Sequence, residues 1–401
     1  MRLRDYQSIR ELHLEIIRPD AQPEHVAGLL QGIGADLAGW AGLLNISFEN
    51  NALPLLYHSL NRLGLDGTIP EQVREVLRKS YLKNTTRNLI LQNELTKILR
   101  SLYDRGIPVI PLKGAIAFIE NIFRDKNVRV MGDLDLLIRR DDRETARQTL
   151  SALNYQTEDQ CGDDMDKMVF QRSAVKVVEI HFLPAGEDLS PYLPGEEVWS
   201  HAVRREKDGI PVLLPSPTDQ LYHLLVHEII QHQRMINYRT LGMYEVYSLL
   251  AFYRETIDFE TLFQRVRRFN IEELFSIYLL LTEEKMGSIL PLSIRDGIRS
   301  RAGKSLRWYG KVSRNPLWLT WAGNRFFIVL STSTGFSSYL KNAYRTLIQE
   351  SVFLKSDPFL LSLYGLTKLP SPLMPLLKGF HVVRMLSLHL VVSLLFLLRR
   401  P

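Results

Sequence analysis

The stretch from Val109 to Ile138, VIPLKGAIAFIENIFRDKNVRVMGDLDLLI, organises the interpretation of the whole chain. An apolar run over Ile107–Leu112 ends in Lys113-Gly114, and a helix-like segment follows. A second apolar segment then covers Val128–Ile138. This pattern predicts a strand that turns into a helix, followed by another strand. Glycine at such a turn lets the backbone approach a phosphate, and the start of a helix offers free N–H groups.

The second apolar segment carries two carboxylates, Asp133 and Asp135. Side chains alternate between the two faces of a strand, so both carboxylates point the same way. Adjacent ionised carboxylates repel each other and are costly to hold without a cation between them. Oxygen ligands at this spacing suit a hard cation such as Mg²⁺, or Mn²⁺ in its place, which shares its coordination shell with phosphates. We therefore expect a metal–nucleotide site here.

A third carboxylate follows about forty residues later, in a segment of strand composition that runs from Val175 to Phe182. Glu179 and His181 share one face of this strand. A glutamate on a neighbouring strand would complete a cluster able to hold one or two metal ions. Arg129, shortly before the aspartate pair, is a candidate for a further phosphate contact.

These motifs resemble a known group. The sequences LKG, R-x-M-G-D-L-D-L-L-I and V-E-I-H resemble the uncharacterised nucleotidyltransferase family of the DNA polymerase β-type superfamily. The resemblance extends upstream through Trp40 and Ala52–Leu60, and downstream through Leu214–Glu228.

The resemblance implies a role for each matching residue. Asp133 and Asp135 match the metal-binding pair of the family, and Glu179 matches its third carboxylate. Lys113-Gly114 stand where related enzymes have a Gly-Ser phosphate loop, which is a departure from the pattern. Membership implies transfer of a nucleotide from a nucleoside triphosphate (NTP) to an acceptor that the family does not define. We expect Lys113, Gly114, Arg129 and His181 to lie at the nucleotide.

The predicted fold class is α+β and mostly helical. A small mixed sheet of the nucleotidyltransferase type is flanked by helices, with further helical regions at both ends of the chain. We expect four parts: an N-terminal helical region over 1–105, the catalytic α/β core over 106–215, a helical region over 216–298 that packs on the core, and a basic, aromatic and apolar helical region over 299–401.

Some local features have two interpretations. Asn84–Asn88 interrupts the apolar pattern of the long helix expected over Glu71–Tyr103, either as a solvated face or as side chains that reach a nucleotide. Asp141 and Asp142 are expected to cap a helix that continues to Leu153.

The region after the catalytic core begins with prolines. Pro211–Pro217 is expected to form a joint, and Ser216 to start a helix. His223 and His227 share a face of that helix, which suits zinc. However, Glu228 follows the second histidine, so the H-E-x-x-H metalloprotease pattern is absent, and histidines packed against the catalytic unit are the favoured interpretation.

Composition is that of an ordinary folded protein, with 45% hydrophobic and 23% charged residues. The one cysteine, Cys161, excludes an intramolecular disulfide and a cysteine zinc cluster. The charged N-terminal sequence lacks the apolar core of a secretory signal. These features predict a cytoplasmic protein.

The net charge of +6 is unevenly distributed. Residues 299–401 hold fifteen Lys and Arg against two acids, a net charge of +13, which leaves −7 for residues 1–298. A basic region with tryptophans and the apolar segment Phe380–Leu398 suggests attachment to an anionic membrane, at the inner face of the cell membrane. A core or oligomer helix and a true membrane span stay open as alternatives, while nucleic acid is a minor one.

Three classes of function are consistent with the sequence. The first is a metal-dependent enzyme that transfers a nucleoside monophosphate to a small molecule, such as a sugar phosphate or lipid-linked glycan precursor. The second is an enzyme that nucleotidylates a protein or tRNA. The third is a non-catalytic scaffold that kept the fold.

Overall fold

The computed structural model describes residues 3–33, 37–157, 166–173, 176–232 and 238–312. The chain divides into two compact units. Unit 1 comprises Met1–His227, Arg239–Leu262 and Leu280–Ile294. Unit 2 draws its described residues from Glu228–Tyr238, Phe263–Leu279 and the segment that starts at Arg295. The division into four parts expected from the sequence stays a prediction, and the predictions for Phe380–Leu398 lie outside the described residues.

Unit 1 begins with a set of short helices that pack on one long one. Their bounds are α1 Leu3–Ile17, α2 Pro23–Ile33, α3 Leu37–Glu49, α4 Leu53–Arg62 and the 3₁₀ turn η1 Asp66–Thr68. Buried apolar side chains, among them Ile16, Trp40 and Leu56, fill the space between these helices. The helical character expected for residues 1–105 is confirmed.

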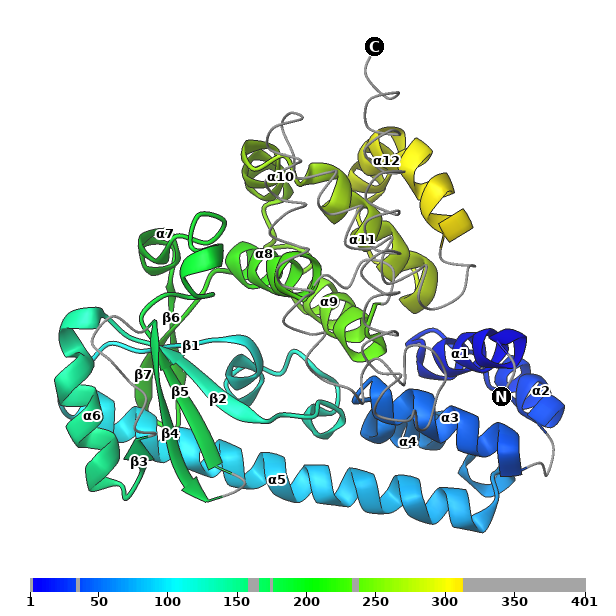
Figure 1. Ribbon diagram of the computed structural model, residues 1–401, viewed down its shortest axis with the longest axis horizontal. Coiled ribbons are helices and arrows are strands. Elements are labelled where there is room, and N and C mark those ends of the chain that lie inside the picture. The colour runs from blue at the N-terminus through cyan, green and yellow to red at the C-terminus, as the bar shows by residue number, and fades with distance from the viewer. Residues whose placement is uncertain (1–2, 34–36, 158–165, 174–175, 233–237, 313–401) are drawn as a thin grey trace, which may run out of the picture. The chain divides into compact units, whose positions relative to one another are not determined.

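The long helix α5 runs from Glu71 to Tyr103, directly after Pro70 as the sequence predicts. Leu91, Leu95 and Ile98 recur at helical spacing and are fully buried against the sheet, so hydrophobic burial stabilises this half of the helix. Figure 1 shows α5 passing beneath the sheet and on beneath α3 and α4. One helix thus connects the sheet to the N-terminal helices.

The main sheet has five strands in the order β1-β2-β5-β4-β3. Only β2 and β5 pair in parallel among the described strands, and the other neighbours are antiparallel. The strands are β1 Ile110–Pro111, β2 Asp133–Leu137, β3 Gln156–Thr157, β4 Lys167–Ser173 and β5 Lys176–His181. The register of the parallel pair sets Asp135 opposite Glu179, which brings two carboxylates from distant parts of the chain side by side.

A second sheet corrects one prediction. Residues Val203–Lys207 (β6) and Ile210–Leu214 (β7) form a hairpin around Asp208-Gly209, where both residues have positive φ. Asp-Gly is the preferred dipeptide for such a tight turn. The joint expected over Pro211–Pro217 is therefore wrong as far as Leu214, because Pro211 lies within a strand.

Two helical segments begin close to residues that the sequence marks. The segment after Lys113 is helical, as predicted, and forms the 3₁₀ helix η2 Lys113–Phe118. After the short 3₁₀ turns η3 Lys126–Val128 and η4 Arg140–Asp142, helix α6 covers Arg143–Ala152. Asp142 is its N-cap residue, as predicted, although its side chain makes no capping hydrogen bond.

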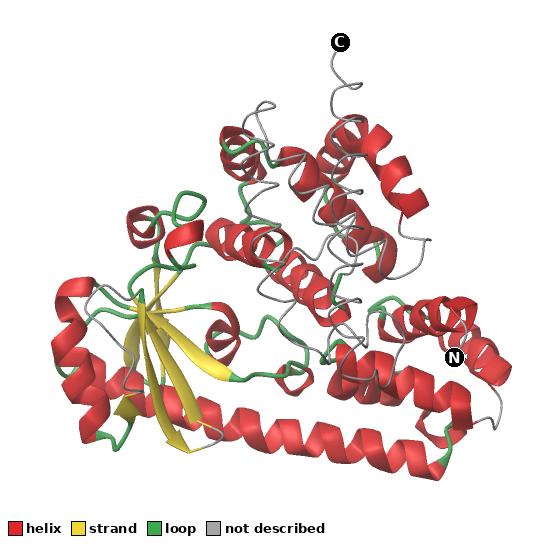
Figure 2. Ribbon diagram, in the orientation of Figure 1, coloured by secondary structure: helices red, strands yellow, loops and turns green. Residues whose placement is uncertain are grey.

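The remaining helices follow the main sheet in the chain. They are η5 Glu187–Leu189, α7 Gly195–Ser200, α8 Pro217–Val226 with a π-helical turn His227–Gln231, α9 Thr240–Phe252, α10 Phe259–Arg268, α11 Glu272–Met286 and α12 Leu292–Val312. Ser216 caps α8 as predicted, because its hydroxyl accepts from the Asp219 N–H. The predicted α+β class, mostly helical with a small mixed sheet, is confirmed (Figures 1 and 2). Among the helices described here, no helix has both the length and the apolar composition that crossing a membrane requires.

Candidate functional site

Three potential metal ligands meet on the parallel strands β2 and β5. Ligand atoms of Asp135, Glu179 and His181 all lie within 4.8 Å of one another. His181 Nε2 lies 2.8 Å from Asp135 Oδ1 and 3.3 Å from Glu179 Oε2. Two lysines complete the cluster, because Lys113 Nζ donates to Asp135 Oδ1 at 2.8 Å and Lys167 Nζ donates to Glu179 Oε2 at 2.6 Å. The register of one strand pair thus creates a compact ionic cluster.

The protonation of the buried pair in this cluster follows from its contacts. Burial by itself would raise the pKa of Asp135, but the hydrogen bond with His181 and the charge of Lys113 outweigh it and bring the pKa well below its usual value. Burial by itself would lower the pKa of His181, but the hydrogen bonds with Asp135 and Glu179 outweigh burial and raise the pKa. Asp135 is therefore a stable anion that holds cations around it.

The other two carboxylates differ from each other. The hydrogen bond with His181 lowers the pKa of Glu179 against the effect of burial, and the hydrogen bond with Lys167 adds to the lowering. The pKa of Asp133 is raised, first by burial and then by the charges of Asp135 and Glu179. Asp133 is the first residue of β2 and lies opposite Val177, outside the group of three ligands. It is the acid whose charge is least compensated.

The turn between β1 and η2 places Lys113 against Asp135. The Leu112 N–H donates to the backbone carbonyl of Asp135 at 2.9 Å, which fixes the turn beside the strand. Lys113 has φ +49°, a left-handed conformation that costs a non-glycine residue about 1 kcal/mol. The surrounding structure holds this strain and directs the ammonium group at the carboxylate.

Gly114 lies in close contact with the Arg129 side chain. A Cβ atom there would lie 2.1 Å from Arg129 Nη1, because the guanidinium group packs directly over the glycine. Arg129 Nε also lies 3.1 Å from Glu245 Oε1, and this acid on α9 is buried. Close approach of the Arg129 side chain therefore accounts for a glycine at this position, and the predicted contact with a phosphate stays a prediction.

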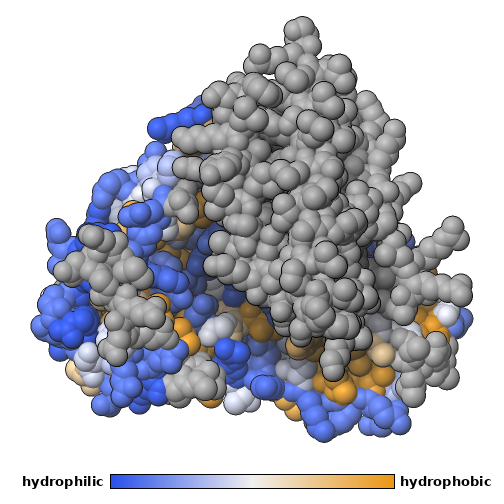
Figure 3. Space-filling model, viewed as in Figure 1, coloured by the Kyte–Doolittle hydropathy of each residue, from blue (hydrophilic) through white to orange (hydrophobic). Residues whose placement is uncertain are grey.

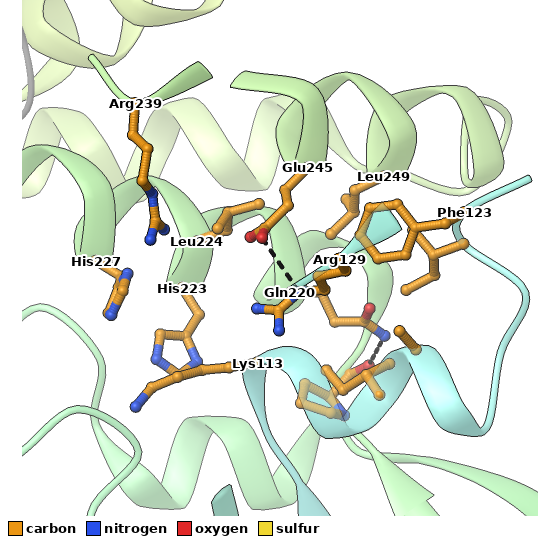
Figure 4. Close-up of a pocket in the computed structure, with 14 residues that line it drawn as sticks. Lys113, Phe123, Arg129, Gln220, His223, Leu224, His227, Arg239, Glu245 and Leu249 are labelled. Carbon is orange, nitrogen blue, oxygen red and sulfur yellow. Dashed lines mark hydrogen bonds and ion pairs between the residues drawn. The ribbon is translucent and has the colours of Figure 1, made fainter. Parts of the chain in front are cut away.

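A pocket opens beside the cluster, between η2, α8 and α9, and lies wholly in unit 1. In Figure 4, Lys113, His223, His227 and Arg239 occupy one end, and the Arg129–Glu245 pair separates them from Phe123 and Leu249. Its other lining residues are Ile116, Ala117, Ile122, Pro215, Gln220 and Leu224. The pocket therefore combines cationic groups with an apolar end.

His223 gives this pocket an unsatisfied hydrogen-bonding group. The side chain is buried, and its Nε2 has no hydrogen-bond partner among the described residues. Burial, followed by the charges of Lys113 and His227, lowers the pKa of His223 well below its usual value. A neutral imidazole can donate one hydrogen bond and accept another, so the orphan nitrogen is suited to a ligand.

Neutral amides on α5 hold the segment that leads into β2, which Figure 2 draws as loop and a short helical turn. Asn84 Nδ2 donates to the carbonyls of Asn127 and Arg129, at 2.6 and 2.9 Å. Asn88 Nδ2 donates to those of Lys126 and Arg129, at 3.1 and 2.9 Å. Both asparagines are buried, so the solvated helix face offered as one interpretation is wrong for them.

The residues predicted from the sequence are thus distributed over two adjoining features. Asp135, Glu179, His181 and Lys113 meet in the ionic cluster, while Arg129 lies over Gly114 and lines the pocket with Lys113. His223 and His227 line the same pocket and belong to no group of three metal ligands in the described part of the chain.

The sequence did not indicate that Glu245 pairs with Arg129, or that Asn84 and Asn88 hold backbone carbonyls. Glu245 could not be distinguished from an ordinary surface charge, because its partner is 116 residues away in the chain and the periodicity of α9 does not mark it. The signal for Asn84 and Asn88 was present, since two amides one turn apart face the core side of a long helix.

The donor set fits a divalent cation. Two carboxylates and one imidazole nitrogen lie close enough to share one ion. Carboxylate oxygens suit Mg²⁺ and Mn²⁺, and the imidazole extends the range toward softer metals. Lys113 and His181 both contact Asp135 Oδ1, so a metal ion at this carboxylate would take the place of these cationic groups.

Comparison with known proteins identifies relatives. A family model described as an uncharacterised nucleotidyltransferase matches residues 36–287. The structure of the antibiotic-resistance factor ANT(2'')-Ia is 14% identical, with 57% of this chain and 98% of that chain covered and a TM-score of 0.29. An antigenic nucleotidyltransferase-like protein from Paracoccidioides brasiliensis is 17% identical, with 47% and 92% covered and the same TM-score of 0.29. Both structural likenesses are weak. No curated protein matches the chain.

Proposed function

The chain belongs to the uncharacterised nucleotidyltransferase family, and from this premise we propose that it transfers a nucleoside monophosphate from an NTP to an acceptor. The observation that carries the proposal is the meeting of Asp135, Glu179 and His181 beside the ammonium group of Lys113. A nucleotide is an anion with an apolar ring, and the adjoining pocket offers cationic groups and an apolar end.

Asp135 and Glu179, together with His181, would hold Mg²⁺ or Mn²⁺, with Asp133 as a further carboxylate from the same face of β2. When bound, the ion would supply positive charge to the triphosphate and act as a Lewis acid. Lys113 and Arg129 would bind phosphate oxygens, and their positive charge would stabilise the charge that grows on the departing pyrophosphate.

The bond changes are those of a simple substitution. An acceptor oxygen forms a bond to the α-phosphorus, and the bond from that phosphorus to the bridging oxygen breaks. The bridging oxygen keeps the electron pair and leaves as pyrophosphate. Glu179 would take the proton of the acceptor hydroxyl, because it is the half-buried carboxylate of the cluster, whereas Asp135 is fully buried.

The location of the reaction follows from charge. We propose that the protein acts in the cytoplasm and that its basic region 299–401 attaches it to the anionic inner face of the membrane. Such attachment would favour a lipid-linked or surface-polysaccharide precursor as the acceptor. Co-sedimentation with anionic and with neutral vesicles tests the attachment.

Nucleotide binding and transfer can be tested together. The full chain is titrated with ATP, GTP, CTP and UTP, each with and without Mg²⁺ or Mn²⁺, and is then incubated with α-labelled nucleotide and cell extract. We expect metal-dependent binding and a labelled product in the wild type. Glu179→Gln should lose the product, whereas Glu206→Gln, a change to an exposed glutamate on β6, should retain it.

The identity of the labelled product separates the functions. Label in a small molecule or a lipid supports the proposal. Label in protein or tRNA would show that the acceptor is a macromolecule instead. Absence of nucleotide binding with every metal would overturn the proposal in favour of a scaffold.

A further inference from the structure

A second pocket lies on the opposite side of the segment that leads into β2. Its wall is built from the α3–α4 turn, the middle of α5 and that segment, all within unit 1. Phe48, Leu53, Ser80, Lys83, Arg87 and Val130 are among its lining residues. None of these residues belongs to the ionic cluster or to the first pocket.

Two positive charges face this pocket without acids to balance them. Lys83 and Arg87 are one turn apart on α5, and among the described residues neither forms an ion pair with a carboxylate. The cations of the preceding turns behave differently, since Arg78 and Lys79 both pair with Glu75. Like charges at this spacing destabilise a helix, so an anionic ligand would relieve the repulsion.

Arg87 has one hydrogen bond in use and another to offer. Its Nη2 donates to the backbone carbonyl of Gly132 at 3.1 Å, which holds the guanidinium group beside the residue before Asp133. Its Nε is buried and has no hydrogen-bond partner among the described residues. A buried N–H without a partner costs about 1–3 kcal/mol, and an anionic oxygen in the pocket would satisfy it.

Apolar side chains line this pocket together with the polar residues Asn51, Ser80 and Asn84. The Phe48 side chain is 69% exposed, and Leu53 and Val130 lie in the same wall. Over the region of α3, α4 and α5, hydrophobic and hydrophilic surface lie next to each other in Figure 3. The pocket therefore suits a small molecule with an anionic group beside a ring or another apolar part.

The two pockets share one wall. Arg129 turns toward the first pocket, where it contacts Glu245, while the next residue, Val130, lines the second pocket. The same segment continues through Gly132 into Asp133, the carboxylate outside the group of three ligands. A ligand in each pocket would approach the carboxylate strand from a different side, which leaves room for two substrates at once.

We propose that the second pocket binds the acceptor, a small molecule that carries a phosphate or carboxylate group beside an apolar or ring portion. The role of this ligand as the acceptor rests on the proposed function, whereas the anion site itself is argued from Lys83, Arg87 and Phe48 alone. Lys83 supplies charge to the anion, and Arg87 positions it against the start of β2.

Titration calorimetry with phenyl phosphate and with benzoate, in the absence of metal, tests the anion site on the full chain. The dissociation constant of the preferred probe should rise about tenfold in Lys83→Met, because a charge-assisted contact is lost. Lys79→Met, a change to an exposed lysine on the same helix, should bind as the wild type does. Lys113→Met, in the first pocket, should also bind the probe normally.

Each outcome decides a separate question. Preference for phenyl phosphate indicates a phosphorylated acceptor, and preference for benzoate indicates a carboxylate. Equal affinity in the wild type and in Lys83→Met, or no binding at all, overturns the anion site. The acceptor role further requires that Lys83→Met bind nucleotide normally and form labelled product about tenfold more slowly. Loss of nucleotide binding in Lys83→Met overturns that role, and a wild type without nucleotide binding instead overturns the proposed function.

Discussion

Two neighbouring regions of the chain are held by different kinds of contact. The ionic cluster on β2 and β5 uses charged groups, whereas the segment before β2 is held by neutral amides. In the cluster, Asp135 is surrounded by the charges of Lys113 and His181. Before the strand, Asn84 and Asn88 hold backbone carbonyls with neutral donors. Both regions are largely buried, but only the first concentrates charge.

The difference indicates which region can change partners. A carboxylate can exchange a lysine or a protonated histidine for a metal ion, because all three are cations. The lysine that is released can then bind a phosphate. The carbonyl of Arg129 accepts hydrogen bonds from both asparagines and has no equivalent replacement inside the protein. We infer that the cluster serves the reaction and that the amides hold the shape of the segment.

The largest expected effect follows from Asp135→Asn. Nucleotide transfer should fall by about 10³-fold or more, because an uncharged amide cannot hold a cation and loss of its charge stabilisation is worth several kcal/mol. The assay is formation of labelled product from α-labelled NTP.

A loss of transfer by Asp135→Asn is informative only if this variant remains folded. Circular dichroism and the unfolding midpoint should show a native fold, and Asp141→Asn, a change to an exposed carboxylate before α6, serves as the matched control. Undiminished transfer by Asp135→Asn would remove the cluster from the reaction.

A smaller effect, on stability and not on activity, is expected from Asn88→Ala. The change removes hydrogen bonds to the carbonyls of Lys126 and Arg129 in a buried site. The free energy of unfolding, measured with urea, should fall by about 1–3 kcal/mol.

Asn93→Ala is the control for Asn88→Ala, because Asn93 lies on the exposed face of the same helix and its truncation should leave stability within about 0.5 kcal/mol of the wild type. If Asn88→Ala had native stability but no transfer activity, the assignment of a purely structural role to the amides would be wrong.

The smallest effect is expected from Gly114→Ala, which connects the two regions. The new methyl group would displace the Arg129 guanidinium, and this group can move at little cost because it ends a flexible side chain. Stability should change by less than about 1 kcal/mol. The nucleotide dissociation constant should rise about tenfold, measured by calorimetry with Mg²⁺, because a charge-assisted contact is displaced.

Gly67→Ala is the control, since a Cβ atom at Gly67 meets nothing within 4 Å. Unchanged nucleotide affinity in Gly114→Ala would show that Arg129 contributes nothing to the pocket.

Much of the core of unit 1 could be predicted because its signals are local. The strand that carries Asp133 and Asp135, the start of α5 after Pro70 and the Ser216 cap each depend on residues within a few positions. The β6–β7 hairpin had an equally local signal in Asp208-Gly209. This hairpin was therefore equally predictable from the sequence.

The sequence by itself determined the α+β class, the carboxylates on two strands and the lysine–glycine turn, because alternation and turn chemistry act between neighbours in the chain. Only the tertiary structure decided which groups meet. The parallel register of β2 and β5 brought Glu179 to Asp135, and the packing of α9 brought Glu245 to Arg129. Contacts between residues far apart in sequence depend on how whole elements pack, and periodicity within one element does not encode that.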